Sequence, residues 1–292
     1  MIGKEFKFRS FAVCHRAEDA RTIAGTEPIL AGAQNNGYNG VISDASGDNI
    51  SALNPVYNEM TAVYWLWKHY DEIGSPEKIV FQQYRRRFAV NAEYNYNECD
   101  LLTEKELENI SSDTQTVDSI FAEADFAAPY PLRVKSVRKQ YSAAHDPSDV
   151  ELALTIISEL TPEYAETAKK YFEGDASYLY NMFAFDRETF FRYAEWIFTV
   201  LDEFVRRRTS EGRLFISERL TGVFFRKLNE EGKREKRLPV LFVAGGKPKL
   251  GECVKAIFKG SGGLKERIKP LVYKFTPRAL WVRRKRKLFF DK

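Results

Sequence analysis

Short apolar segments alternate with amphipathic helical patterns along most of the chain. Residues 6–14 and 78–81 are largely apolar and rich in β-branched or aromatic residues, which is typical of buried strands. Residues 178–185 and 238–244 have the same character, and residues 213–216 are a shorter candidate. Because strands alternate with helices, the pattern predicts an α/β sheet.

Helix start signals separate these strands. Asn54 and Pro55 combine an N-cap residue with a proline at the first helical position. Ser148 and Glu151 form a capping-box pattern that opens an amphipathic helix. Asp186 precedes a long stretch whose apolar positions recur at helical spacing. The sequence therefore predicts helices that begin near these residues.

Composition excludes several classes of protein. The chain has 292 residues, of which 44% are hydrophobic and 29% are charged, so it is not a disordered chain. No apolar run is long enough to span a bilayer as a helix. The three cysteines are scattered and lack a CxxC spacing, which argues against a structural zinc site and for a reducing compartment. We expect a cytoplasmic protein.

Positive charge is concentrated at the C-terminal end. Residues 259–292 contain 12 Lys or Arg and 2 acidic residues, so this segment carries +10 and the rest of the chain carries −6. Aromatic residues such as Trp281 and Phe289 lie among the basic ones. We predict a catalytic domain over residues 1–246 and a basic aromatic tail over residues 247–292.

This tail has more than one interpretation. It fits an anionic membrane surface, where each basic residue contributes about 1 kcal/mol and aromatic rings enter the headgroup region. A solvated basic end is the alternative. A nucleic-acid arm is less favoured, because no nucleic-acid-binding module accompanies the charge.

Three consecutive arginines follow the predicted strand over residues 78–81. Open α/β sheets bind ligands at this end of a strand, and guanidinium groups bind phosphate oxygens in pairs. If the strand continues, Tyr84 and Arg86 share one face, and Arg85 and Arg87 share the other. The run therefore indicates a phosphate site, with a solvated or salt-bridged strand end as the alternative.

Residues 25–51 are rich in Gly, Asn, Asp and Ser and predict a long loop, which is usually functional in a compact domain. Asp44, Asp48 and Asn49 are candidates for binding sugar hydroxyls or a cation, but the string alone favours an ordinary polar turn. The spacing is not that of a calcium loop. The chain also lacks the GxGxxG, GxxxxGK[ST] and GxSxG motifs.

Two further polar groups lie near predicted helix ends. Tyr141, His145 and Asp149 are four residues apart, although the intervening Asp-Pro-Ser sequence is expected to break a helix. His145 is a candidate base or phosphate ligand, or a structural hydrogen-bonding residue. Glu218 is a candidate general base, or a residue that stabilises the helix start through the helix dipole.

Several short motifs occur in order along the chain: Asp48-Asn49-Ile50-Ser51, Asn54-Pro55, Glu59 to Thr61, Tyr64 to Lys68, Gln83 to Phe88, Asn181-Met182-Phe183, Glu195-Trp196 and Ser217 to Leu220. Together they resemble a bacterial family that is often found in capsule and exopolysaccharide gene clusters. The resemblance covers roughly residues 8–244. The sequence departs from the family pattern at Gln83, where His is usual, and at Cys14-His15-Arg16, where Thr-His-Lys is common.

The resemblance implies a nucleotide-sugar-dependent glycosyltransferase of the type A architecture, in which a Rossmann-like mixed sheet is flanked by helices. Some relatives are galactofuranosyltransferases. The implied reaction moves galactofuranose or another hexose, with UDP as the favoured nucleotide, onto a growing lipid-linked surface polysaccharide. The basic tail would then hold a cytoplasmic enzyme peripherally at the inner membrane face.

The motifs and the residue chemistry together give a candidate site. The catalytic candidates are Glu218, Asp149, Arg85 and Arg86. The donor-binding candidates are His15, Arg16, Asp48, Asn49, Gln83, Tyr84 and Arg86. The candidates for binding the acceptor or the sugar are His145, Asn181, Met182 and Arg219.

Type A transferases commonly use an Asp-x-Asp pair to hold a divalent ion on the diphosphate, and this chain has Gln-Tyr-Arg-Arg at the equivalent strand end. We expect arginine charge to replace the metal, so neither a divalent ion nor a permanently bound cofactor is predicted. Glu218 is the first candidate for the base and Asp149 the second. The alternatives are a non-enzymatic assembly protein that binds polyanions or glycans, and a phosphate-group transferase of the same pathway. No nucleic-acid partner is expected.

Overall fold

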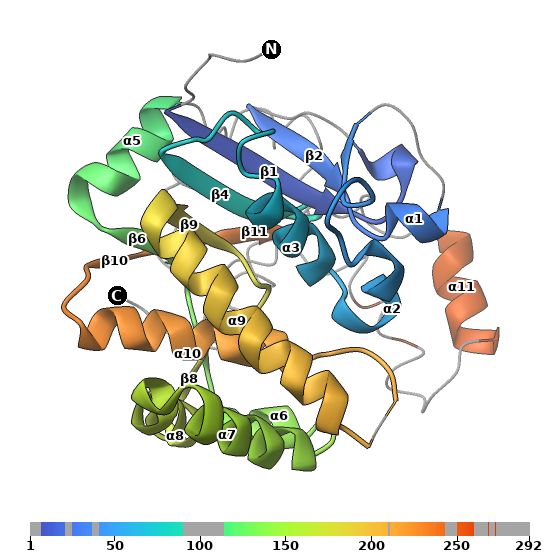
Figure 1. The fold of residues 1–292 in the computed structure, drawn as a ribbon. Coiled ribbons are helices and arrows are strands. Elements are labelled where there is room, and N and C mark those ends of the chain that lie inside the picture. Colours follow the sequence, from blue (N-terminus) through green and yellow to red (C-terminus); the bar gives the residue numbers. More distant parts are fainter. Residues whose placement is uncertain are drawn as a thin grey trace.

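The structure is a computed structural model that describes residues 7–20, 25–36, 41–89, 114–209, 211–242 and 250–259, together with positions 268 and 272 (Figure 1). Apart from residues 250–259 and those two positions, the predicted tail lies outside the described residues. The domain boundary at residue 246 therefore stays a prediction.

A mixed sheet forms the centre of the fold. Its strands are β1 (Phe8–Cys14), β2 (Thr26–Leu30), β3 (Ile42–Ser43), β4 (Lys78–Gln83), β5 (Arg86–Phe88), β6 (Phe126–Pro129), β9 (Phe183–Asp186), β10 (Glu235–Leu238) and β11 (Val240–Phe242). The order is β10-β6-β9-β4-β1-β2-β3, and β5 pairs with β4 and β11. Strands β1 to β4 run parallel, whereas β9 runs antiparallel to β4 and β6. A second, two-stranded sheet pairs β7 (Leu132–Arg133) with β8 (Ala176–Ser177).

Helices flank the sheet. They are α1 (Ala33–Asn36), α2 (Asn54–Tyr57), α3 (Met60–Lys68), α5 (Thr114–Glu123), α6 (Val137–Ser142), α7 (Ser148–Leu160), α8 (Ala165–Glu173), α9 (Arg187–Arg207), α10 (Ser217–Glu230) and α11 (Leu250–Lys259). Short 3-10 turns cover Ala17–Asp19, Ser51–Leu53 and Pro162–Tyr164. The predicted α/β fold with a mixed sheet flanked by helices is confirmed.

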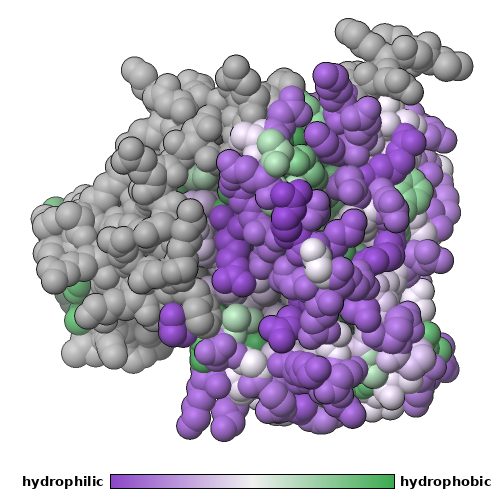
Figure 2. All heavy atoms as spheres, turned by 90° about the vertical axis from the view of Figure 1, so that its left-hand side faces the viewer, coloured by the Kyte–Doolittle hydropathy of each residue, from purple (hydrophilic) through white to green (hydrophobic). Residues whose placement is uncertain are grey.

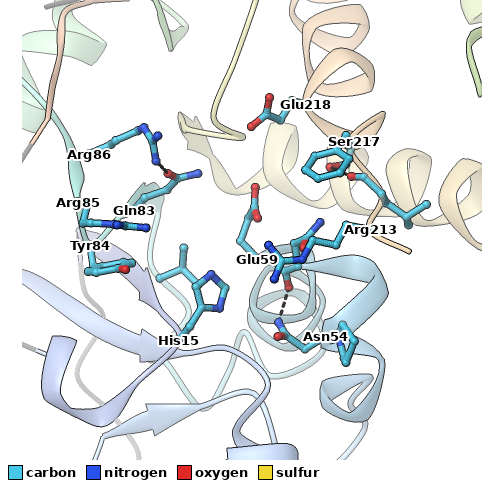
Figure 3. A pocket seen from close by; sticks show the side chains of 15 residues that line it. His15, Asn54, Glu59, Gln83, Tyr84, Arg85, Arg86, Arg213, Ser217 and Glu218 are labelled. Carbon is cyan, nitrogen blue, oxygen red and sulfur yellow. Dashed lines mark hydrogen bonds between the residues drawn. The ribbon is translucent and has the colours of Figure 1, made fainter. Parts of the chain in front are cut away.

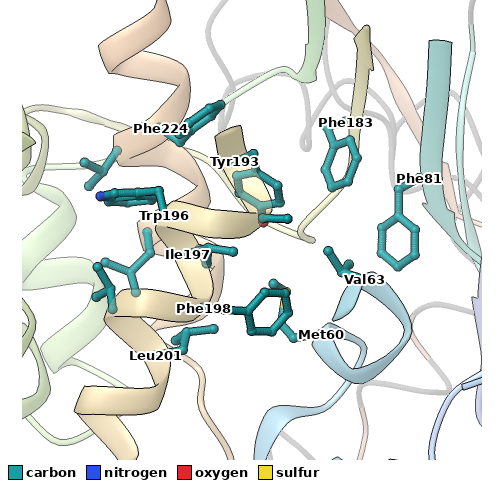
Figure 4. Packing of buried hydrophobic residues seen from close by; sticks show 14 of the residues in the cluster. Met60, Val63, Phe81, Phe183, Tyr193, Trp196, Ile197, Phe198, Leu201 and Phe224 are labelled. Carbon is teal, nitrogen blue, oxygen red and sulfur yellow. The ribbon is translucent and has the colours of Figure 1, made fainter. Parts of the chain in front are cut away.

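Alternate residues of β4 face two apolar clusters. Ile79 and Phe81 belong to the larger cluster, which includes residues of α3, α9 and α10, whereas Val80 belongs to a smaller cluster with residues of α5. Phe183 of β9 stacks on Phe81, with 5.5 Å between the ring centroids (Figure 4). This packing holds the end of β4 in a fixed position relative to α3 and α10.

Helices α6, α7 and α8 gather beyond α9 and α10, on the side away from the sheet (Figure 1). Contacts between α7 and α9 and between α8 and α10 join this layer to the rest. Figure 2 shows one face of the molecule, where the described residues are mostly hydrophilic and the apolar ones form small, separate patches. Such scattered apolar residues are normal for a protein surface.

The predicted helix starts agree with the structure. The Asp186 carboxylate accepts a hydrogen bond from the Thr189 amide at 2.7 Å and so caps α9. Helix α7 begins at Ser148, and α2 begins at Asn54 with its proline in the first turn, but neither side chain caps its helix, so these two cap predictions are wrong. The N-cap residues are Pro147 and Leu53, and Ser148 Oγ instead donates to Asp146 Oδ1 at 2.7 Å.

Three predictions of strands and loops are wrong. Residues 25–51 are not a loop throughout, because Thr26–Leu30 pairs in parallel with β1 and Ile42–Ser43 adds β3. The strand expected over residues 178–185 begins only at Phe183, because the two residues before Met182 have positive φ and cannot continue a strand. Residues 213–216 form no strand and are held by a hydrogen bond from the Leu214 amide to the Val56 carbonyl, at 2.8 Å.

Candidate active site

A cavity of about 590 Å³ opens at the carboxyl ends of β1 and β4. Strand order switches here, because β2 lies on one side of β1 and β4 on the other, and such switch points bind ligands in open α/β sheets. The lining residues come from the ends of β1 and β4, the region of α2 and α3, and the start of α10: Val13, His15, Asn54, Pro55, Asn58, Glu59, Gln83, Tyr84, Arg85, Arg86, Arg213, Leu214, Phe215, Ser217 and Glu218 (Figure 3).

A tight hairpin brings two arginines to this cavity. Gln83 at the end of β4 pairs with Arg86 at the start of β5, so Tyr84 and Arg85 form the turn. The expectation that the strand continues and separates Arg85 from Arg86 is wrong, because the chain reverses at this turn. Both side chains line the cavity, whereas Arg87 is 6% exposed and is not among the lining residues.

Gln83 orients Arg86. Its Oε1 accepts a hydrogen bond from Arg86 Nη1 at 2.7 Å, and its Nε2 donates to the Tyr180 carbonyl at 2.8 Å. The Arg86 guanidinium also lies over the Tyr180 ring, 4.7 Å from the centroid. The carboxamide thus connects the hairpin to the segment before β9 and fixes the guanidinium beside the cavity.

Other nitrogen-bearing groups border the same space. The Arg85 guanidinium lies 4.8 Å from the centroid of the Tyr84 ring, and Arg213 reaches the cavity from the segment before α10. Within the described part of the chain, neither arginine forms an ion pair with a carboxylate. Partial desolvation beside the cavity and the positive charges of Arg213 and Arg85 lower the pKa of the exposed His15 imidazole.

Two carboxylates lie opposite the hairpin (Figure 3). Glu59 directly precedes α3, and Glu218 lies in the first turn of α10. Burial and the negative charge of Glu218 raise the pKa of Glu59 to about 7, although the hydrogen bond from Asn181 and the charge of Arg86 act in the other direction. The cavity therefore has Arg85 and Arg86 on one side and two interacting carboxylates on the other, with Arg213 on the carboxylate side (Figure 3).

Asn181, a predicted sugar-binding residue, lies beneath the cavity and contacts Glu59. Its Nδ2 donates to Glu59 Oε1 at 2.9 Å and to Ser217 Oγ at 3.1 Å, and its Oδ1 accepts from Thr221 Oγ1 at 2.7 Å. Asn181 is 1% exposed, and its neighbour Met182 is buried in the smaller apolar cluster. Neither residue lines the cavity directly.

Arg219 and His145 are also not lining residues, but each contacts a residue that is. Arg219 forms an ion pair with Glu218 at 2.7 Å and donates to Gln140 Oε1 at 2.9 Å. The His145 ring stacks on the lining residue Phe215, with centroids 4.4 Å apart. Burial and the charge of Arg219 lower the pKa of His145. Both side chains thus support lining residues.

Two other predicted site residues lie elsewhere. Asp149 is buried in α7, accepts a hydrogen bond from Tyr141 Oη at 2.6 Å and lies 3.8 Å from Arg208. Arg16 is exposed and forms ion pairs with Glu18 and Asp19. The structure does not bring either residue into the cavity lining.

The polar loop after β3 is folded onto α3. Asp48 accepts a hydrogen bond from Tyr64 Oη at 3.0 Å, and its carbonyl oxygen contacts His69 Nε2 at 3.0 Å. Asn49 Nδ2 donates to the Gly47 carbonyl at 2.9 Å. A Cβ on Gly47, which has φ of +55°, would lie 2.2 Å from the His69 ring. The loop is thus closely fitted to the helix, and neither Asp48 nor Asn49 lines the cavity.

Asp44 holds the start of this loop. It is fully buried and accepts hydrogen bonds from the Gly32 and Ala33 amides and from Ser51 Oγ, at 2.7, 3.0 and 2.5 Å. These contacts satisfy the carboxylate within the protein. Among the residues that the structure describes, no group of three or more His, Cys, Asp or Glu is arranged to hold a metal ion.

The sequence analysis missed Glu59, Arg213 and Asn58 as site residues. In the sequence, Glu59 is part of a longer motif and Arg213 opens a short candidate strand, so neither has a distinct signal of its own. Asn58 has φ of +53° and ψ of −135°, a conformation that favours glycine. Asn58 and Glu59 directly precede the apolar helix α3. A polar pair at this position is the sequence signal that could have indicated a turn with its carboxylate in the cavity.

The comparisons with known proteins agree with this fold. Residues 9–230 match the family described as "Domain of unknown function (DUF4422)". The chain belongs to this family. The DUF4422 region includes every residue that lines the cavity.

The apo structure of the bifunctional glycosyltransferase WbbM is similar to this chain, with a TM-score of 0.72 and 24% sequence identity. The match covers 83% of this chain and 46% of that chain, so this chain spans less than half the length of WbbM. No curated protein matches the sequence. At this level of identity the likeness establishes a shared fold, which agrees with the type A expectation.

Proposed function

We propose that this DUF4422 protein is a nucleotide-sugar-dependent glycosyltransferase, with UDP as the favoured nucleotide. The observation that carries the proposal is that two arginines and two carboxylates line one cavity, namely Arg85, Arg86, Glu59 and Glu218. This cavity lies where the strand order of the sheet switches. A diphosphate requires cationic groups, and an acceptor hydroxyl requires a base. The volume of about 590 Å³ lies in the range of small-molecule sites. The fold shared with WbbM supports the same proposal.

In this proposal the arginines stabilise the leaving group. As the bond between the sugar and the diphosphate breaks, negative charge develops on the departing phosphate oxygen. A guanidinium already held in place, as Gln83 holds Arg86, stabilises that charge without reorganisation. We therefore propose that no divalent ion is required. Activity should survive EDTA; loss with the chelator and rescue by manganese would contradict this part.

A thermal-shift screen tests the donor class. The protein is heated with UDP-, GDP-, CMP- and dTDP-sugars, with and without manganese. The expected result is a higher melting temperature with one nucleotide class, largest for a UDP-sugar and independent of manganese. The product mass then separates the reactions, because a transferred hexose and a transferred phosphate add different increments. A phosphate increment would favour the phosphate-group transferase.

We also propose that the acceptor is a lipid-linked glycan and that the C-terminal region holds the protein at the anionic inner membrane face. Leu250, Val254 and Phe258 are spaced four apart on α11 and are 54%, 44% and 76% exposed. The +10 segment of residues 259–292 follows directly. An exposed apolar stripe joined to basic residues suits a membrane surface. None of the helices in the described ranges is long and apolar enough to cross a membrane.

Vesicle sedimentation tests this part. The protein should sediment with vesicles that contain an anionic phospholipid and much less with neutral vesicles. A Val254→Ser and Phe258→Ser double variant should weaken sedimentation, and deletion from Lys259 should abolish it. Equal sedimentation of the deletion variant would contradict the proposal. Salt-sensitive nucleic-acid binding without any sugar transfer would instead favour a non-enzymatic assembly protein.

A further inference from the structure

Glu59 has a fixed position and keeps hydrogen-bond acceptor capacity toward the cavity. Its Oε1 accepts the hydrogen bond from Asn181 Nδ2 at 2.9 Å. The Asn181 amide cannot be reversed without loss, because its Oδ1 accepts from Thr221 Oγ1, which in turn contacts Tyr193 Oη at 2.7 Å. The Glu59 backbone amide also donates to this carboxylate. Among the described residues, no other side chain donates a hydrogen bond to Glu59, so the carboxylate keeps acceptor capacity toward the cavity that it lines.

The electrostatic surroundings suit a group that accepts a proton near neutral pH. Burial and the charge of Glu218 raise the pKa of Glu59 to about 7. A general base is most efficient when its pKa lies near the working pH. The amide of Asn181 donates to the ionised form and so keeps that form accessible.

The other candidates for this role have different partners. Glu218 is paired at 2.7 Å with Arg219, whose side chain is 3% exposed. The Glu218 carboxylate is therefore already engaged by a buried guanidinium. Asp149 lies outside the cavity lining and accepts the Tyr141 hydroxyl. Of the carboxylates considered, only Glu59 combines a lining position with a hydrogen-bonded, unpaired side chain.

We propose that Glu59 is the catalytic base of the transfer and that Asn181 is its positioning residue; this rests on the proposed function. The acceptor hydroxyl gives its proton to the Glu59 carboxylate as its oxygen forms a bond to the anomeric carbon. The bond from that carbon to the diphosphate oxygen breaks, and its electron pair stays on the phosphate beside Arg86. Glu59 later releases the proton to water. This single displacement inverts the anomeric configuration.

The test compares Glu59→Gln with Glu218→Gln in the full-length protein, using the donor found by the thermal-shift screen. Glu59→Gln should lower kcat about 10²–10⁴-fold, with the donor KM changed less than threefold. In the wild type, kcat should rise with pH and level off above about pH 7, where Glu59 is ionised. Glu218→Gln should keep a rising limb, moved to lower pH because one negative charge near Glu59 is gone.

A chemical rescue separates a base from a structural residue. Azide is a nucleophile that carries no proton to remove, so it needs no base. Azide should restore cleavage of the donor in Glu59→Gln, with an inverted glycosyl azide as product, and should not restore it in Arg86→Ala. Glu59→Asp, which keeps a shorter carboxylate, should retain the rising pH limb at a lower kcat.

Asn181→Gly tests the positioning role. Glycine tolerates the φ of +48° at this position and removes only the side chain. Without the donated hydrogen bond, the midpoint of the pH profile should move to higher pH, while kcat on the high-pH plateau should fall less than tenfold. An unchanged midpoint would exclude the positioning role.

The outcomes distinguish this inference from the proposed function. If the wild type binds no nucleotide sugar and transfers no sugar, the proposed function is wrong, and the assignment of Glu59 as the base is wrong as well. If the wild type transfers sugar but Glu59→Gln keeps more than a tenth of kcat with the same pH profile, only the inference is overturned. A product with retained configuration would also overturn it.

Discussion

Two polar clusters near the end of the parallel strands have opposite arrangements. In the loop after β3, Asp44 accepts three hydrogen bonds from its own surroundings and Asp48 contacts Tyr64 and His69. In the cavity, Arg85 lies beside open space and, within the described residues, has no carboxylate partner. Both clusters are candidates for a ligand site by composition alone. The difference shows that a polar cluster indicates a ligand site when the protein leaves some of its charges or hydrogen-bonding groups without a partner.

The largest expected effect is on the cavity side. Arg86→Ala should lower kcat about 10²–10³-fold, because a preplaced donor to the developing phosphate charge is lost. The melting temperature should change little. Arg16→Ala is the matched control, since Arg16 is an exposed arginine outside the lining. Steady-state kinetics of both variants test the contrast, and a near-wild-type Arg86→Ala would remove Arg86 from the site.

On the loop side, the largest expected effect is on stability. Asp44→Ala should lower the free energy of unfolding by about 2–4 kcal/mol, because two buried amides and a hydroxyl lose their acceptor. Urea denaturation measures the change. At a temperature where the variant is folded, its kcat should stay within threefold of the wild type. A large loss of kcat in the folded variant would place the loop in the reaction.

Glu59 should affect both activity and stability. It lines the cavity, and its ionised form is unfavourable because the carboxylate is buried. Its pKa in the folded state, about 7, is higher than the ordinary value of 4.5, so the unfolded state ionises first as pH rises. Stability should fall between about pH 4.5 and 7 and stay lower above pH 7. Glu59→Gln should therefore raise the free energy of unfolding by roughly 3 kcal/mol at pH 8 and by almost nothing at pH 4.5. Urea titrations at the two pH values test this sign; a variant less stable than the wild type at pH 8 would contradict it.

The smallest expected effect is at Asp48. Its side chain is exposed and accepts one hydrogen bond from Tyr64 Oη, so Asp48→Ala should cost no more than about 1 kcal/mol of stability. Since Asp48 lies outside the cavity lining, the donor KM should change less than threefold. A tenfold rise in donor KM would restore the original prediction that Asp48 binds the donor.

Local signals explain how much of the fold could be predicted. The cap at Asp186 and the proline after Asn54 act on neighbouring residues, and the apolar strand over residues 78–81 shows a clear composition. Strand β2 was missed because its short apolar run contains Pro28 and is surrounded by Gly, Asn and Asp. Pairing with β1, which sequence composition does not reveal, stabilises it.

The candidate site was predictable only in part. Arg85 and Arg86 follow a core strand. Because open α/β sheets bind ligands at the carboxyl ends of their strands, the sequence alone indicates that these residues lie near a ligand site. The face to which each arginine points was not predictable, because it depends on a two-residue turn that reverses the chain. Glu59 and Arg213 come from two other segments, and only tertiary packing brings them to the same cavity.

The reversed direction of β9 has a consequence for this site. Parallel strands bring their final residues to the cavity. An antiparallel neighbour instead brings the residues that precede it next to the lining, and here these are Tyr180, which contacts Gln83, and Asn181, which contacts Glu59. The contact between Asn181 and Glu59 therefore depends on the register in which β9 pairs with β4, set by pairs such as Phe81 with Phe183. A slip of two residues would displace Asn181 by roughly 7 Å. The stacked phenylalanines in the core thus maintain the alignment on which the hydrogen bond from Asn181 to Glu59 depends.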